Sequence, residues 1–140
     1  MPTLNPGRVL LGERLFNDRR LSRDGTRSCS TCHDIGTNGA SANARDMTPE
    51  GSPLPLNTLT VFNAGLKYRL NWAGSFRSLE EQAKQTLRNP AIMASSPDDV
   101  VGKLRADSAT ARRSSRASQG RTGCVRRGRA SGVAHYAWTL

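Results

Sequence analysis

Two cysteines three positions apart, followed directly by a histidine, are the residues of this sequence best suited to chemistry. They form the stretch Cys29-Ser30-Thr31-Cys32-His33. This spacing is typical of a c-type haem attachment site. Two thiols nearly one helical turn apart share a face, so each can add to one vinyl group of the same haem. The adjacent histidine can then become the proximal ligand of the iron.

Two other interpretations of this motif are open. A two-cysteine, two-histidine zinc site needs a second ligand pair with close spacing. The sequence offers only Cys124 and His135, which lie far apart. The remaining alternative is a redox-active or accidental Cys-x-x-Cys pair. No second haem motif surrounds Cys124, and we interpret it as incidental.

Short helices and long loops must position the motif. Three segments have a polar capping residue before their first turn, and their expected helices begin at Pro6, Leu79 and Pro97. Residues 34–57 are rich in Gly, Ser, Asn and Pro, which predicts a long loop. Strand-like alternation and internal repeats are both missing from the pattern. We therefore predict an all-α, cytochrome c-like fold with long loops.

Length and composition limit the remaining possibilities. The 140 residues fit one domain, and only 36% of them are hydrophobic. No apolar run is long enough to span a membrane. The start of the sequence lacks the apolar core of a secretory signal. Haem attachment to this motif in bacteria normally follows export, so we expect a periplasmic protein whose signal has been removed or whose sequence begins inside a longer gene.

The net charge of +10 is unevenly distributed. Residues 1–102 hold 12 basic and 10 acidic side chains, whereas residues 103–140 hold 9 basic and 1 acidic. From Ser108 onward Arg, Ser, Gly and Ala dominate, which predicts a disordered basic segment. This segment has no interleaved aromatic residues through Arg129 and no recognisable binding fold, so we do not expect nucleic-acid binding.

With its flanks, the motif resembles the N-terminal haem domain of the bacterial di-haem cytochrome c peroxidase family, including its MauG-like members, from Asn5 to about Asp107. Five stretches carry the resemblance: LGERLFNDRRLS (11–22), DGT (24–26), SCSTCHD (28–34), LNTLTVFNA (56–64) and SLEEQ (78–82). The resemblance implies that hydrogen peroxide is reduced at the N-terminal haem. It also implies a second haem domain, which relays electrons from a small donor protein such as a cytochrome c or a cupredoxin.

The resemblance also suggests roles for individual residues. Trp72 matches a tryptophan between the two haems and would be an electron relay, although plain core packing is the alternative. Asn57 matches an asparagine that helps to bind calcium at the domain interface, although it could simply cap a loop. The family often has a histidine as removable sixth iron ligand; Met47 stands near that place, and Met93 is a second candidate.

The proton shuttle of the peroxidases is missing at its expected position. These enzymes use a glutamate to split the O–O bond, and that position falls at Ile92, which cannot carry a proton. Glu50 and Glu81 are the remaining glutamate candidates, and neither matches by position. We therefore expect this chain alone to be a weak or inactive peroxidase.

We divide the chain into a c-type haem domain at residues 1–107 and a basic, low-complexity tail at residues 108–140. The tail has the composition of a G+C-rich gene read in the wrong frame, and a genuine basic tail is the alternative. Because the sequence holds one Cys-x-x-Cys-His motif, we expect one covalent haem in a product truncated before its second haem. The alternative function is that of a stand-alone mono-haem electron-transfer cytochrome c.

Overall fold

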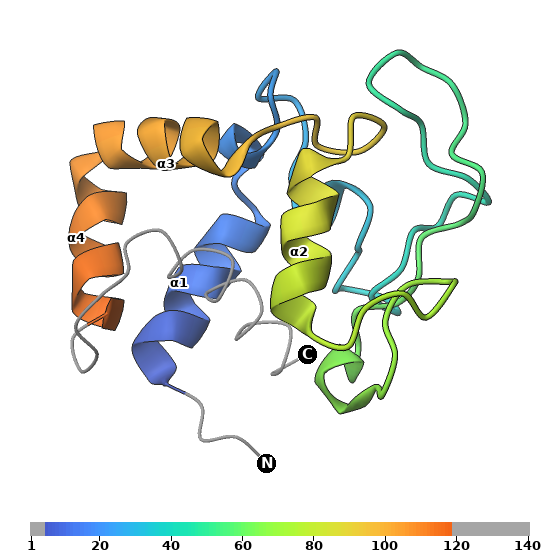
Figure 1. Cartoon of the computed structure of the whole chain (residues 1–140), viewed down its shortest axis with the longest axis horizontal. Helices are drawn as coiled ribbons and strands as arrows, with labels where there is room; N and C mark the ends of the chain where they lie inside the picture. Colours follow the sequence, from blue (N-terminus) through green and yellow to red (C-terminus); the bar gives the residue numbers. More distant parts are fainter. Residues whose placement is uncertain (1–4, 119–140) are drawn as a thin grey trace.

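The computed structural model describes residues 5–118, and helices are the only regular elements in that range. The α-helices are α1 (Pro6–Phe16), α2 (Leu79–Arg88), α3 (Pro97–Ala106) and α4 (Ser108–Ser118). Three single 3-10 turns are η1 (Arg19–Leu21), η2 (Cys29–Thr31) and η3 (Ala64–Leu66). Figure 1 shows α3 running across one end of the other helices, with the long loops on the side of α2. The predicted all-α class is confirmed.

The capping residues act where the sequence predicted them. The side chains of Asn5, Ser78 and Ser96 accept hydrogen bonds from backbone N–H groups in the first turns of α1, α2 and α3, at 3.1, 3.1 and 3.0 Å. These bonds satisfy donors that have no partner within the helix. All three helices therefore begin at the predicted residues. None of the helices in residues 5–118 is long and apolar enough to cross a lipid bilayer.

The hydrophobic core lies where α1, η1, α3 and α4 meet. Its buried members are Leu11, Leu15, Leu21, Met93, Val100, Leu104 and Ala117. Leu104 is completely inaccessible to solvent. This core fixes the first helix and, through Leu21, the turn that leads to the cysteines.

Residues 108–118 differ from the prediction of a disordered segment, because they form helix α4 and pack against α1. Asp107 caps this helix: its carboxylate accepts from the Ala109 N–H at 3.0 Å and from the Thr110 hydroxyl at 2.6 Å. The contact with α1 uses small residues, since a Cβ on Gly7 would lie 3.8 Å from the Cα of Ala117. A helix that packs through alanine and serine has no large apolar stripe, so its pattern was not recognised. The other predicted tail residues, 119–140, lie outside the described residues.

Between η2 and α2 the chain forms a long series of loops, as predicted for residues 34–57. Residues 46–54 make a small hairpin, with an isolated antiparallel bridge between Met47 and Pro53. A second isolated bridge pairs Leu70 with Phe76. These loops contact the turn that carries the cysteines, because Asp46 lies beside Cys32 and the Gly39 carbonyl lies 3.2 Å from Nδ1 of His33.

Candidate functional site

The cysteine motif forms one tight 3-10 turn. Backbone N–H groups of Cys32 and His33 donate to the Cys29 carbonyl at 3.2 and 3.0 Å. The Ser28 N–H donates to the Thr31 hydroxyl at 2.9 Å, which closes the start of the turn. Both cysteines therefore project from one short, internally bonded segment, and His33 follows directly.

The two thiols are free and half-buried. Burial raises the pKa of Cys29 to about 12. Burial and then the nearby Asp46 carboxylate raise the pKa of Cys32 to about 11. Both groups are therefore neutral thiols at physiological pH, and neither is joined in a disulfide.

The imidazole of His33 has a defined orientation. Its Nδ1 lies 3.2 Å from the Gly39 carbonyl oxygen. Burial lowers the pKa of His33, which favours the neutral ring. A neutral ring that donates from Nδ1 keeps a lone pair on Nε2, which is the form in which histidine binds a metal. The buried ring of Phe16 on α1 lies beside it, with centroids 6.2 Å apart.

Gly39 is a site residue that the sequence analysis missed. Its φ of +72° lies in the left-handed region, and a Cβ there would come within 2.9 Å of the Thr60 hydroxyl oxygen and 3.0 Å of Phe62 Cδ1. Its carbonyl also accepts from the Val61 N–H at 3.0 Å. The dipeptide Asn38-Gly39 is a known turn signal, but nothing in the pattern linked that turn to His33.

This donor set fits a covalently attached haem. Two reduced thiols on one turn can bond to neighbouring vinyl groups, and the adjacent neutral imidazole can ligate the iron. The zinc alternative finds no support in the described range, because residues 5–118 contain no group of three or more His, Cys, Asp or Glu arranged to hold a metal ion. Cys124 and His135, the other zinc candidates, lie outside that range.

The structure brings Trp72 and Asn57 together. The indole N–H of Trp72 donates to the Asn57 carbonyl at 2.8 Å. Trp72 is 51% exposed, so it is not packed in the core of the described chain. The Asn57 side chain is exposed as well. The expected relay and calcium roles of these two residues stay predictions.

The candidate sixth ligands and the shuttle position lie in different surroundings. Met47 sits on the 46–54 hairpin and is 52% exposed, whereas Met93 is buried within the core. Ile92 is half-buried and packs against that same core. Glu50, in the hairpin turn, and Glu81, in the first turn of α2, are both exposed.

A groove of about 710 Å³ lies elsewhere, between α1 and α4. Charged side chains dominate its lining, among them Arg14, Arg20, Asp107 and Arg113. None of the three motif residues Cys29, Cys32 and His33 lines it. The groove is therefore separate from the candidate haem site at the motif turn.

The comparison with known proteins decides the family. A family model described as "Di-haem cytochrome c peroxidase" matches residues 6–138. The chain belongs to the di-haem cytochrome c peroxidase family. The match includes most of the segment that composition set apart as a basic tail.

Two relatives from this family show how much of the chain is similar and how much of each relative it covers. The chain is 41% identical over 94 residues to cytochrome c551 peroxidase of Pseudomonas aeruginosa, covering 67% of this chain and 27% of that protein. It is 39% identical over 103 residues to methylamine utilization protein MauG of Methylorubrum extorquens, covering 74% of this chain and 29% of that protein. The chain therefore spans about a quarter of the length of these curated relatives.

A solved structure shares the fold of this chain. A MauG-like protein associated with microbial copper homeostasis superposes with a TM-score of 0.87 at 23% identity, covering 99% of this chain and 42% of that one. At this identity the likeness shows the fold alone. The predicted cytochrome c-like architecture is thereby confirmed.

Proposed function

We propose that this chain carries one covalent haem c, attached through Cys29 and Cys32 and ligated by His33, as the N-terminal haem domain of a di-haem peroxidase. The observation that carries the proposal is the orientation of His33. Its Nδ1 faces the Gly39 carbonyl at 3.2 Å, which leaves Nε2 as the ligating atom beside two free thiols.

In the bound state the haem supplies one-electron redox chemistry and an iron that can bind peroxide. The protein supplies the rest. Cys29 and Cys32 hold the group on the η2 turn, and Phe16 packs beside His33 from α1. The hydrogen bond from Nδ1 fixes the plane of the imidazole and raises its basicity as a ligand.

The parent reaction is reduction of hydrogen peroxide to two molecules of water, with uptake of two electrons and two protons. The electrons come from a small donor protein, a cytochrome c or a cupredoxin, through a second haem. Half-exposed Trp72 is the proposed relay toward that haem, and Asn57 is a proposed calcium ligand. We place the protein in the periplasm, where haem c is attached in bacteria.

The chain by itself is proposed to be a slow peroxidase. Ile92 packs against the core where the peroxidases have their acid–base glutamate. The sequence holds a single haem motif, so a second electron must come from outside the chain. This single motif also favours the second candidate, a mono-haem electron-transfer cytochrome. Turnover of peroxide with a reduced donor cytochrome separates the two, because an electron carrier exchanges single electrons with no catalytic consumption of peroxide.

The first experiment tests attachment. The chain should be exported in a host with a cytochrome c maturation system, and the product extracted with acid acetone. We expect haem that stays with the protein, with the absorption bands of a bis-thioether haem. Replacing both Cys29 and Cys32 by alanine should abolish covalent attachment.

Cys124→Ala is the matched control, because it removes a thiol outside the motif and should leave the haem content unchanged. A product that carries zinc and no haem would refute the proposal.

Met47→Ala tests the sixth ligand in the same material. The weak near-infrared band of methionine–iron charge transfer should disappear if Met47 ligates the iron, and an unchanged spectrum would reject Met47 as the sixth ligand.

A further inference from the structure

The hairpin at residues 46–54 begins directly beside the haem-attachment turn. Its first residue, Asp46, is only 6% exposed, and its carboxylate raises the pKa of the Cys32 thiol. That carboxylate accepts from the hydroxyls of Ser41, at 2.7 Å, and Thr58. The hairpin is therefore fixed at its base, close to one of the two attachment cysteines.

The body of the hairpin is closed by its own backbone. The Thr48 N–H donates to the Ser52 carbonyl, and the Leu54 N–H donates to the Asp46 carbonyl, both at 2.7 Å. These bonds shape the hairpin but do not tie it to the rest of the domain. The position of Met47 relative to the motif depends on contacts from outside the hairpin.

Arg27 makes such a contact. Its two terminal nitrogens donate to two consecutive carbonyls of the hairpin, those of Met47 and Thr48, each at 2.5 Å. Because the guanidinium is planar and rigid, two charge-assisted bonds from it fix both distance and direction. Arg27 stands two positions before Cys29, so these bonds join the hairpin directly to the attachment turn.

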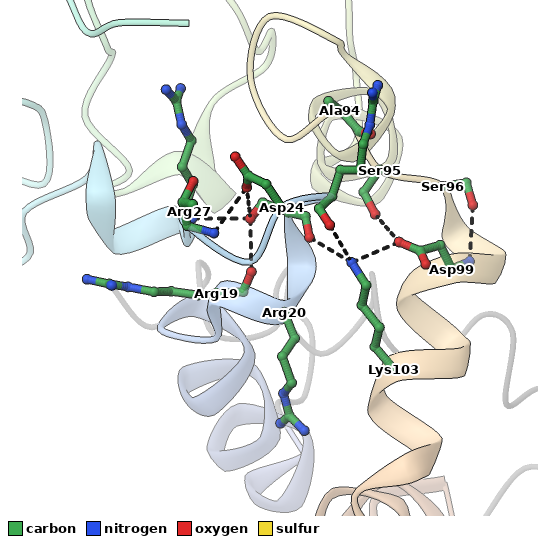
Figure 2. Close-up of polar contacts among 12 residues, drawn as sticks. Arg19, Arg20, Asp24, Arg27, Ala94, Ser95, Ser96, Asp99 and Lys103 are labelled. Carbon is green, nitrogen blue, oxygen red and sulfur yellow. Dashed lines mark hydrogen bonds and ion pairs between the residues drawn. The ribbon is translucent and has the colours of Figure 1, made fainter. Parts of the chain in front are cut away.

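The segment that carries Arg27 is itself held by polar contacts, some of which are drawn in Figure 2. Its N–H donates at 3.1 Å to the hydroxyl of Ser22, a residue that is 1% exposed. From α3, the ammonium of Lys103 donates to the carbonyls of Ser22 and Arg23 at 2.9 and 3.0 Å. Lys103 also pairs with Asp99 at 3.0 Å. The turn that carries Arg27 is thus anchored to α3.

We propose that Arg27 is a positioning residue that holds the 46–54 hairpin, and Met47 with it, at a fixed place beside the haem-attachment turn. This inference rests on the proposed attachment of haem at Cys29 and Cys32. Were Met47 the sixth ligand, this hold would also slow the entry of a small ligand such as cyanide at the iron. Loss of the two bonds frees the hairpin without removing any residue that attaches or ligates the haem.

The test compares Arg27→Gln with the unmodified haem-loaded chain. Two measurements are made: hydrogen exchange of the Thr48 and Leu54 amides, and the rate at which cyanide binds the ferric protein. We expect exchange and cyanide association each to rise about ten-fold or more, since two hydrogen bonds from a charged donor are lost. Arg27→Lys keeps a cationic donor but has a single nitrogen in place of two, so its exchange and cyanide rates should lie between those of Arg27→Gln and the unmodified chain.

Arg19→Gln is the matched control. It makes the same substitution on an arginine of the neighbouring η1 turn, whose guanidinium forms no hydrogen bond or ion pair within residues 5–118. Its two rates should equal those of the unmodified chain. Unchanged exchange in Arg27→Gln would overturn the proposal, because the hairpin would then be held without Arg27. Faster exchange with an unchanged cyanide rate would overturn the effect on ligand entry. A failure of haem attachment in the unmodified chain would instead refute the proposed function, and the exchange comparison would still decide whether Arg27 holds the hairpin.

Discussion

Gly39 offers a sharp test of how the imidazole of His33 is oriented. Replacing Gly39 by alanine adds one methyl group at a backbone φ of +72°. The new Cβ would lie 2.9 Å from the Thr60 hydroxyl oxygen and 3.0 Å from the ring of Phe62. The loop that presents the Gly39 carbonyl to His33 must therefore shift.

Two effects contribute to the cost. A non-glycine residue in the left-handed region costs about 1–2 kcal/mol. Overpacking a methyl group against fixed neighbours costs about 1–3 kcal/mol more. The sum of about 2–5 kcal/mol is a large part of the stability of a typical domain, about 5–15 kcal/mol. At about 4 °C per kcal/mol, the melting temperature of Gly39→Ala should fall by about 8–20 °C.

The haem-loaded protein provides a second measurement. When Nδ1 loses its acceptor, the imidazole becomes a weaker donor to the oxidised iron. A hydrogen bond worth about 1 kcal/mol corresponds to a reduction potential about 40 mV more positive for a one-electron couple. Thermal unfolding by circular dichroism and a spectroelectrochemical titration measure the two effects independently.

Gly51→Ala is the control, because Gly51 has a φ of +83° with nothing within 4 Å of the added Cβ. It carries the backbone strain alone and should lower the melting temperature by about 4–8 °C, with no change in potential. Equal effects of Gly39→Ala and Gly51→Ala on both measurements would refute the reasoning that the Gly39 carbonyl is held in place by Thr60 and Phe62.

Two further predictions follow from single residues. Ile92→Glu places a carboxylic acid at the family's shuttle position and should speed the first step with peroxide, measured by stopped flow, by up to about 10²-fold. The control is Leu87→Glu, at the other half-buried position against the same core, which should destabilise the fold without speeding this step. Equal rates in the two variants would exclude a shuttle role for residue 92. Asp107 has a pKa lowered to about 2 from 3.8, first by the hydrogen bond from Thr110, so it stabilises α4 above about pH 4 and loses this effect as the pH falls toward 2. Asp107→Asn should therefore unfold at a lower temperature than the unmodified chain at pH 6, and this difference should shrink to a small part by pH 2. A difference as large at pH 2 as at pH 6 would contradict the assignment.

Local signals carried most of the information about secondary structure in this sequence. A capping serine or asparagine acts on N–H groups within its own first turn, so the starts of α1, α2 and α3 could be predicted without the fold. Helix α4 could not be recognised, because its interface with α1 depends on small residues and close approach. Such packing leaves no periodic pattern of large apolar side chains.

The residues of the candidate site also divide into those with a local sequence signal and those whose role depends on the fold. The proposed attachment motif is a local pattern, and Cys29, Cys32 and His33 were predicted from spacing alone. Gly39 and Arg27 were not found, because their roles depend on which loops the fold places against the motif. The Arg27 contacts bridge 20 and 21 residues, and no short sequence pattern records a pairing over that distance.

The anchoring of the motif by Lys103 has a consequence for the order of folding. The contact between Lys103 and the Ser22 carbonyl spans 81 residues, so the turn before the cysteines is fixed by a contact that closes most of the described chain into one loop. Closing a loop of this size is entropically costly and is therefore a late event. Cys29 and Cys32 precede α3 along the chain, and until α3 docks their segment is held only by bonds within its own turn and the neighbouring loops. Attachment of the haem would thus have a kinetic window, which opens when the exported chain reaches the periplasm and narrows once α3 has packed.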